Sequence, residues 1–132
     1  MKPTPESEKL SVEITDPVIV IRIQRAYRPD LSEQELYEAT RGVWVIGSRR
    51  SGARYVLAVY DRIVREVYAV EGWHRAGTTV YTTRPLADVH RDGRWEFTGR
   101  VAPDVVRDRY VGKSVGGLWK RGAANPITYV NC

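Results

Sequence analysis

The stretch RYVLAVYDRIVREVYAV, residues 54–70, decides the fold. It holds two apolar runs, residues 54–60 and 63–70, which only Asp61-Arg62 separates. β-Branched and aromatic residues dominate both runs, and a short polar break between such runs is typical of a tight β-hairpin. Each run carries apolar residues on both of its faces. We therefore expect two central strands of a covered or closed sheet.

Further strands are expected on either side of this hairpin. Short β-branched or alternating runs predict them at residues 18–23, 43–46, 78–83, 95–101 and 127–130. The clearest helix signal is Ser32 followed by Glu35, which has the form of a capping box, with Gly42 expected in the left-handed conformation at the helix end. A second short helix is expected over residues 104–110, and a brief helical turn within residues 114–121.

Length and composition favour one folded domain. The chain has 132 residues, of which 42% are hydrophobic and 28% charged, so general disorder is excluded. Residues 1–10 hold two prolines and mixed charge and are expected to form a flexible tail ahead of a single domain at residues 11–132. The predicted fold class is α+β, mainly β. It is a small, strongly curved sheet or β-barrel of about six or seven strands with one or two short helices.

Three features favour a cytoplasmic protein that does not enter a membrane. No apolar run approaches the ~18 residues of a transmembrane helix. The first ten residues lack the apolar core of a secretory signal. The one cysteine, Cys132, is the last residue and cannot form an internal disulfide.

The charge is unevenly distributed and arginine dominates it. Residues 1–40 carry five basic and eight acidic side chains, whereas residues 41–132 carry sixteen basic and eight acidic ones. Of the 21 basic residues, 17 are arginine, whose guanidinium fork suits phosphate oxygens and stacks on bases. The composition is thus compatible with a nucleic-acid partner. A genome rich in G and C would enrich arginine equally well.

No strong catalytic or metal-binding motif is present. Gly112-Lys113-Ser114 resembles the end of a P-loop, but Arg107 occupies the position at which a P-loop requires glycine. The two histidines lie sixteen residues apart and there is one cysteine, so we expect no metal site. No cofactor is expected either. The cluster Asp88, His90 and Asp92 could hold a hard cation, although a solvated loop is the favoured interpretation.

Three side chains are candidates for acid–base catalysis. Glu66 lies inside an apolar run, where it either pairs with an arginine such as Arg41 or Arg65 or lines a cavity; an ion pair is favoured. His74 follows a tryptophan and could act as a base in a pocket, and Asp61 lies in the hairpin turn.

The aromatic residues suggest a binding surface. Twelve of the thirteen are tryptophan or tyrosine, whose rings suit half-wet pockets and base stacking. Trp73, expected in a loop at residues 71–75, is the best candidate for a ligand-facing ring, with Trp44 or Tyr60 as a second; Trp95 is expected to fill the core. Asn125 either reads a base edge or caps a turn. The residues expected to contact phosphates are Arg41, Arg49, Arg50, Arg54 and Lys113.

The order of these segments resembles the PUA-like superfamily, which includes the ASCH, EVE, YTH and SRA domains. The resemblance rests on a helix followed by TRGVWVIG (residues 40–47), then the hairpin of residues 55–70, then WEF (residues 95–97). It departs from the family at the hairpin turn, where Asp61-Arg62 replaces the usual glycine, and at the C-terminal residues 129–132. The resemblance implies a small β-barrel that binds RNA or DNA, often with a modified or flipped base in an aromatic pocket.

The leading hypothesis is therefore a non-enzymatic module that binds DNA or RNA and holds a base, modified or plain, in an aromatic pocket. The first alternative is a small enzyme that uses Glu66, His74 or Asp61 on a nucleotide-like or other small substrate. The second is a protein-interaction module or homodimer. The nucleic-acid-binding hypothesis requires basic residues to converge on one face. The enzyme hypothesis requires Glu66 or His74 to line a concave pocket.

Overall fold

The hairpin that the sequence predicts forms the centre of the sheet. The computed structural model describes residues 12–24, 27–119 and 124–132. Within them, β3 (Tyr55–Tyr60) and β4 (Ile63–Arg75) pair in antiparallel fashion. The turn between them consists of Asp61 and Arg62, which both have positive φ, 50° and 65°. Two consecutive positive-φ residues twist the hairpin in the direction that the flanking strands require, so the turn keeps this geometry without glycine.

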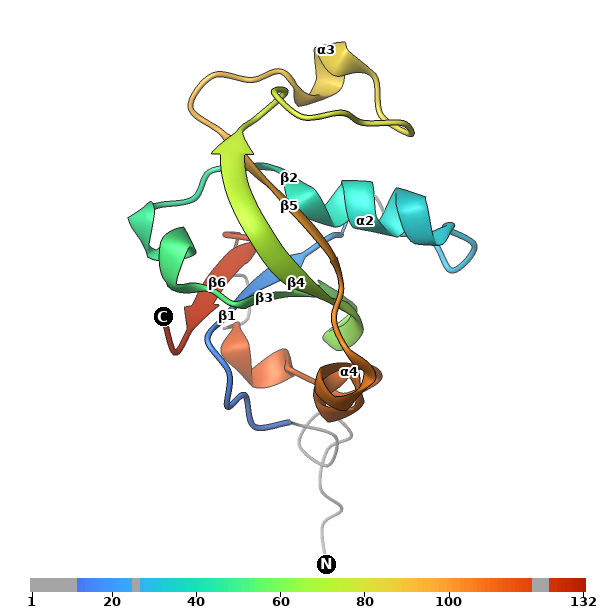
Figure 1. The fold of residues 1–132 in the computed structure, drawn as a ribbon. Coiled ribbons are helices and arrows are strands. Elements are labelled where there is room, and N and C mark those ends of the chain that lie inside the picture. The colour runs from blue at the N-terminus through green and yellow to red at the C-terminus, as the bar shows by residue number, and fades with distance from the viewer. Residues whose placement is uncertain (1–11, 25–26, 120–123) are drawn as a thin grey trace, which may run out of the picture.

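The six strands form one strongly curved sheet that resembles half of a barrel (Figure 1). Their order across the sheet is β2-β5-β4-β3-β1-β6. The bounds of the remaining strands are β1 (Val18–Arg22), β2 (Gly42–Trp44), β5 (Trp95–Val101) and β6 (Ile127–Val130). β1 runs parallel to β3, and every other neighbouring pair is antiparallel. The predicted fold class is thus confirmed.

Three short α-helices lie among the described residues: α2 (Glu33–Arg41), α3 (Leu86–Val89) and α4 (Asp104–Tyr110). Two further segments, Ser48–Gly52 and Gly116–Leu118, form 3-10 turns. The capping box is confirmed, because the Ser32 hydroxyl accepts from the Glu35 N–H at 3.1 Å and the Glu35 carboxylate accepts from the Ser32 N–H at 3.1 Å. The expected left-handed Gly42 is wrong: its φ is −166°, because Gly42 is already the first residue of β2.

Apolar clusters cover both faces of the sheet. Leu57 and Val59 of β3 face one cluster, to which α4 contributes Val106 and Tyr110. The alternate residues of β3 face the other cluster, against which Leu36 and Tyr37 of α2 pack. Both faces of the hairpin are therefore buried, as its apolar pattern predicts.

The segment between β4 and β5 differs from the sequence-based expectation. Residues 78–83 were expected to form a strand, but they are part of a long loop that leads into α3 at one end of the molecule (Figure 1). β4 in turn continues to Arg75, so Trp73 and His74 lie on a strand rather than in a loop. A register shift at Gly72 keeps this second half of β4 paired with β5. Strand pairing thus takes up residues 71–75, and the loop begins after them.

Candidate functional site

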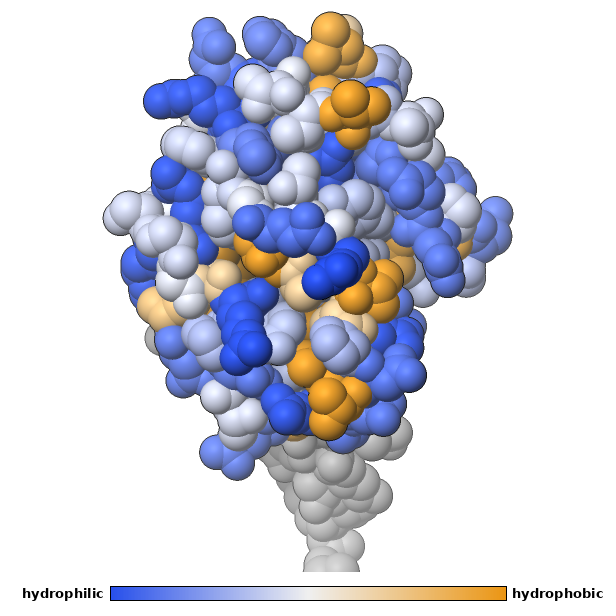
Figure 2. Space-filling view, viewed as in Figure 1, coloured by the Kyte–Doolittle hydropathy of each residue, from blue (hydrophilic) through white to orange (hydrophobic). Residues whose placement is uncertain are grey.

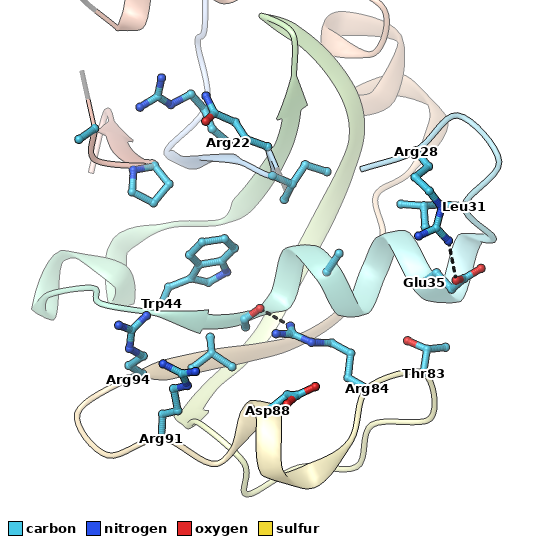
Figure 3. A pocket seen from close by; sticks show the side chains of 17 residues that line it. Arg22, Arg28, Leu31, Glu35, Trp44, Thr83, Arg84, Asp88, Arg91 and Arg94 are labelled. Atoms are coloured by element: carbon cyan, nitrogen blue, oxygen red, sulfur yellow. Dashed lines mark hydrogen bonds and ion pairs between the residues drawn. The ribbon is translucent and has the colours of Figure 1, made fainter. Parts of the chain in front are cut away.

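A cavity of about 660 Å³ opens between α2, β2 and the segment that carries α3 (Figure 3). The ends of β1 and β6 complete its wall. Among its described lining residues, five arginines face two carboxylates, an excess of three positive charges. The five are Arg22, Arg28, Arg84, Arg91 and Arg94, and the carboxylates are Glu35 and Asp88. We call this site the arginine cleft.

Trp44 supplies the aromatic surface of the arginine cleft. It lies between Arg22 on one side and Arg91 and Arg94 on the other (Figure 3). Its indole Nε1 donates to the Thr40 carbonyl at 2.7 Å, which fixes the ring against the end of α2. A half-buried, oriented indole is a suitable platform on which a base can stack.

Three of the five arginines are engaged with neighbouring protein groups, and two of these are Arg22 and Arg28. Arg22 donates to the Asn125 carbonyl at 2.9 Å, and its guanidinium lies 4.8 Å from the centre of the Trp119 ring. Arg28 pairs with Asp30 at 3.3 Å and with Glu35 at 3.5 Å. The carboxylates therefore offset part of the positive charge on the side of the cleft near the start of α2.

Arg84 is held in place by backbone carbonyls. Its Nη1 donates to the carbonyl oxygens of Glu38 at 2.9 Å and of Gly42 at 2.5 Å. These oxygens belong to the last turn of α2 and its C-cap, where cations are favoured by the helix dipole. The guanidinium is thus positioned before any ligand arrives.

Arg91 and Arg94 are the cations best able to receive an anion. Arg91 is exposed and Arg94 half-buried. Within the part of the chain that the structure describes, neither side chain makes a hydrogen bond or an ion pair. An incoming phosphate would therefore not have to displace a carboxylate from them.

A buried carboxylate, Glu38, fixes the loop on the other side of Arg84. It accepts hydrogen bonds from the backbone N–H groups of Thr82 and Thr83, at 3.0 and 2.8 Å, and from both threonine hydroxyls at 2.8 Å. Burial by itself would raise the pKa of Glu38, but hydrogen bonds from Gln34, Thr83 and Thr82 outweigh it and lower the pKa to about 2. Glu38 is therefore ionised at neutral pH although no solvent reaches it.

A second buried carboxylate, Glu96, fixes the beginning of the same loop. It accepts from the Gly77 N–H at 2.6 Å and the Tyr81 hydroxyl at 3.0 Å, and it makes a short contact with the Thr79 hydroxyl. Arg41, 3.7 Å away, supplies the opposite charge. Burial, followed by the charge of Glu96, raises the pKa of Tyr81.

Arg41 itself is not available to phosphates, which corrects the sequence-based expectation. Only 2% of its surface is exposed. Its guanidinium donates to the Thr79 hydroxyl at 2.7 Å, to the Phe97 carbonyl at 3.2 Å and to the Val80 carbonyl at 2.5 Å. Arg41 is a structural residue that ties the loop to β5.

The other cations expected at phosphates contact different protein groups. Arg49 donates to the Cys132 carbonyl at 2.9 and 2.5 Å, and the guanidinium of Arg50 lies 3.5 Å from the centre of the Trp95 ring. Arg54 is exposed beside Tyr55. Lys113 donates to the Asp108 carbonyl at 3.1 Å, after the end of α4. The described lining of the arginine cleft includes none of these four.

Of the expected base-reading residues, Trp44 alone is in the described lining of the cleft. Trp73 is half-buried against Phe97, with ring centres 5.4 Å apart, and Tyr60 packs on Tyr27 at 4.5 Å. Asn125 caps its turn, because its side-chain oxygen accepts from the Ile127 N–H at 3.0 Å. For Asn125, the turn-capping alternative is the one observed.

The three residues proposed for acid–base catalysis do not converge. Glu66 pairs with Arg107 at 2.7 Å, which confirms the ion pair but with a partner other than Arg41 or Arg65. The hydrogen bond and charge of Glu66 raise the pKa of Arg107. His74 lies eight residues further along β4, roughly 20 Å or more away, and contacts the Thr98 hydroxyl at 2.9 Å. Asp61 lies in the hairpin turn before β4 begins.

Neither a metal centre nor a membrane span is visible in the described residues. Among them, no group of three or more His, Cys, Asp or Glu side chains could hold a metal ion. No helix in residues 12–24, 27–119 and 124–132 is long and apolar enough to cross a bilayer.

Sequence reasoning did not single out Arg84, Arg91 and Arg94 or the buried carboxylates. Glu96 alternates with Trp95 and Phe97, a pattern typical of a half-buried strand with its polar residues toward solvent, yet Glu96 is buried. One available signal was the run TTVYTTR at residues 78–84, whose four threonines offer many donors to a buried carboxylate. The chain matches no protein-family model, no curated protein and no solved structure at a significant level.

Proposed function

We propose that the protein is a nucleic-acid-binding module that holds an unpaired nucleotide in the arginine cleft. The base stacks on Trp44, and Arg91 and Arg94 contact the flanking phosphates. One observation carries this proposal: five arginines and one oriented indole surround the same cavity.

The chemistry and the size of the cleft both support this function. Guanidinium groups bind phosphate oxygens through paired hydrogen bonds, and indole rings stack on bases of any sequence. Its volume of about 660 Å³ falls within the usual range of small-ligand sites. A single nucleotide fits such a space, whereas a duplex does not. The proposal therefore favours single strands or unpaired positions.

The test measures binding of an internally labelled single-stranded 12-mer, as DNA and as RNA, by fluorescence anisotropy at ~50 mM salt. R91A/R94A should weaken binding, because it removes the two arginines of the cleft whose side chains have no hydrogen bond or ion pair with any described residue. The control R54A/R100A removes the same number of positive charges from two exposed arginines, neither of which is in the described lining of the cleft.

Two results would contradict the proposal. If the folded wild-type protein shows no measurable affinity for either strand, the protein does not bind plain nucleic acid. If R54A/R100A weakens binding as much as R91A/R94A does, the binding surface lies outside the arginine cleft.

A further inference from the structure

From the charge and arrangement of the arginine cleft, we infer that it binds the phosphorylated end of a nucleic-acid strand. The ligand group is a terminal phosphomonoester rather than an internal phosphodiester. This inference rests on the proposed function and specifies which part of a strand enters the site.

The charge of the arginine cleft matches the phosphorylated end of a nucleic-acid strand better than an internal position of that strand. The described lining has an excess of three positive charges. An internal nucleotide brings two phosphodiesters with one negative charge each. A terminal nucleotide brings a phosphomonoester of about −1.5 to −2 at pH 7 together with one phosphodiester, close to three negative charges in all. Charges that leave water are tolerated best when they are fully paired.

The placement of three arginines favours a phosphomonoester for a second reason. Arg84, Arg91 and Arg94 come from the single segment that flanks α3, and all three line the cleft (Figure 3). A phosphomonoester offers three terminal oxygens as acceptors, whereas a phosphodiester offers two. A terminal phosphate can therefore accept hydrogen bonds through one more oxygen than an internal phosphate in a cleft rich in guanidinium groups.

The segment that carries these arginines is fixed at several points. Glu38 holds Thr82 and Thr83 directly before Arg84, and Glu96 holds Gly77 and Thr79 further upstream. Arg84 itself is tied to the end of α2. A site that is already ordered spends little binding free energy on ordering when the phosphate arrives.

Hydrophobic side chains lie beside the charged residues of this segment. Val80 and Leu86 are 83% and 65% exposed. Figure 2 shows hydrophobic groups at the end of the molecule that carries α3, surrounded by polar ones. The charged lining of the cleft, rather than this apolar tip, determines the proposed ligand.

The experiment compares four ligands of one sequence, each with the dye at an internal position. They are a linear 12-mer with a 5′-phosphate, the same strand with a 3′-phosphate, the strand with hydroxyls at both ends, and the circular strand. We expect one of the phosphorylated ends to bind at least about tenfold more tightly than the hydroxyl-ended strand, the effect of one additional hydrogen bond between charged groups. The two phosphorylated arms distinguish the 5′ end from the 3′ end.

The variants assign this preference to the cleft. R91Q/R94Q should reduce the ratio of affinities for phosphorylated and hydroxyl ends to near one, whereas R54Q/R100Q should leave that ratio unchanged. If hydroxyl-ended and circular strands bind as tightly as both phosphorylated ones, the inference is wrong and the proposed function stands. If none of the four ligands binds, the proposed function and the inference both fail.

Discussion

Of the rings that the sequence predicts as stacking platforms, Trp44 is the one in the described lining of the cleft. Sequence reasoning named Trp44, Trp73 and Tyr60 as possible stacking rings, since a polar-edged ring near arginine suits a base. Trp73 instead packs inward on Phe97, because β4 continues five residues past the expected end. Which ring faces a ligand depends on strand pairing, and local sequence does not contain that information.

Truncation of Trp44 should remove the stacking platform. We expect Trp44→Ala to cost about 1–3 kcal/mol of oligonucleotide affinity while the dependence on salt is unchanged, because the ring carries no charge. Trp44→Phe keeps a ring and loses only the bond to the Thr40 carbonyl, so it should retain most of the affinity. Anisotropy at three salt concentrations, with thermal melting to check folding, makes the comparison. Equal losses in both variants would show that the ring does not stack on the ligand.

Glu38 should determine part of the acid stability of the protein. Its pKa falls from the ordinary 4.5 to about 2 in the folded state, so ionised Glu38 stabilises the fold above pH 4.5. That contribution, about 3 kcal/mol, is lost as the pH falls through the folded pKa near 2. Urea unfolding at pH 7, 4 and 2.5 measures the free energy of unfolding of both proteins. The wild type should be more stable than Glu38→Gln at pH 7, and this difference should shrink toward low pH. A constant difference between the two proteins would contradict this assignment.

At the scale of elements, the local sequence was sufficient to predict a structure whose interacting residues lie close together in the chain. The capping box of α2 and the turn of the β3–β4 hairpin each involve residues at most three positions apart, and both were predicted. The strand expected at residues 78–83 was wrong for the opposite reason. The N–H groups of Thr82 and Thr83 bond to the carboxylate of Glu38, 44 and 45 residues away, instead of to a neighbouring strand. No local pattern reveals so distant an acceptor.

The capping box of α2 offers a direct test at this scale. Ser32→Ala should destabilise the protein by about 0.5–2 kcal/mol, because the Glu35 N–H loses its acceptor at the helix start. Ser32→Asp keeps an acceptor and should be nearly neutral. Urea denaturation of the three proteins measures the difference in unfolding free energy. If the Asp variant is as unstable as the Ala variant, the cap does not stabilise α2.

For the whole molecule, charge along the chain proved a poor guide to charge in space. Residues 1–40 are net acidic, yet they contribute Arg22 and Arg28 to the arginine cleft. Arg49, Arg50 and Lys113 belong to the basic part of the chain, but their partners lie elsewhere on the surface. Composition therefore predicted the kind of side chain at the site. The sheet order β2-β5-β4-β3-β1-β6, which decides which arginines meet, could not be read from the sequence.

The salt dependence of binding distinguishes a compact cleft from a broad basic surface. A cleft that contacts two or three phosphates should give a log–log slope of roughly −1.4 to −2.1 on single strands. A broad surface would give a slope that steepens with each nucleotide added. We expect R91A/R94A to flatten the slope by about 1.4, the share of two phosphate contacts, while R54A/R100A leaves it unchanged. The measurement is anisotropy across a salt series with strands of three, six and twelve nucleotides. Because the contacts lie inside one cavity, the three strands should give nearly the same slope. A slope that grows in proportion to strand length would show that phosphates bind along the outside of the sheet rather than in the arginine cleft.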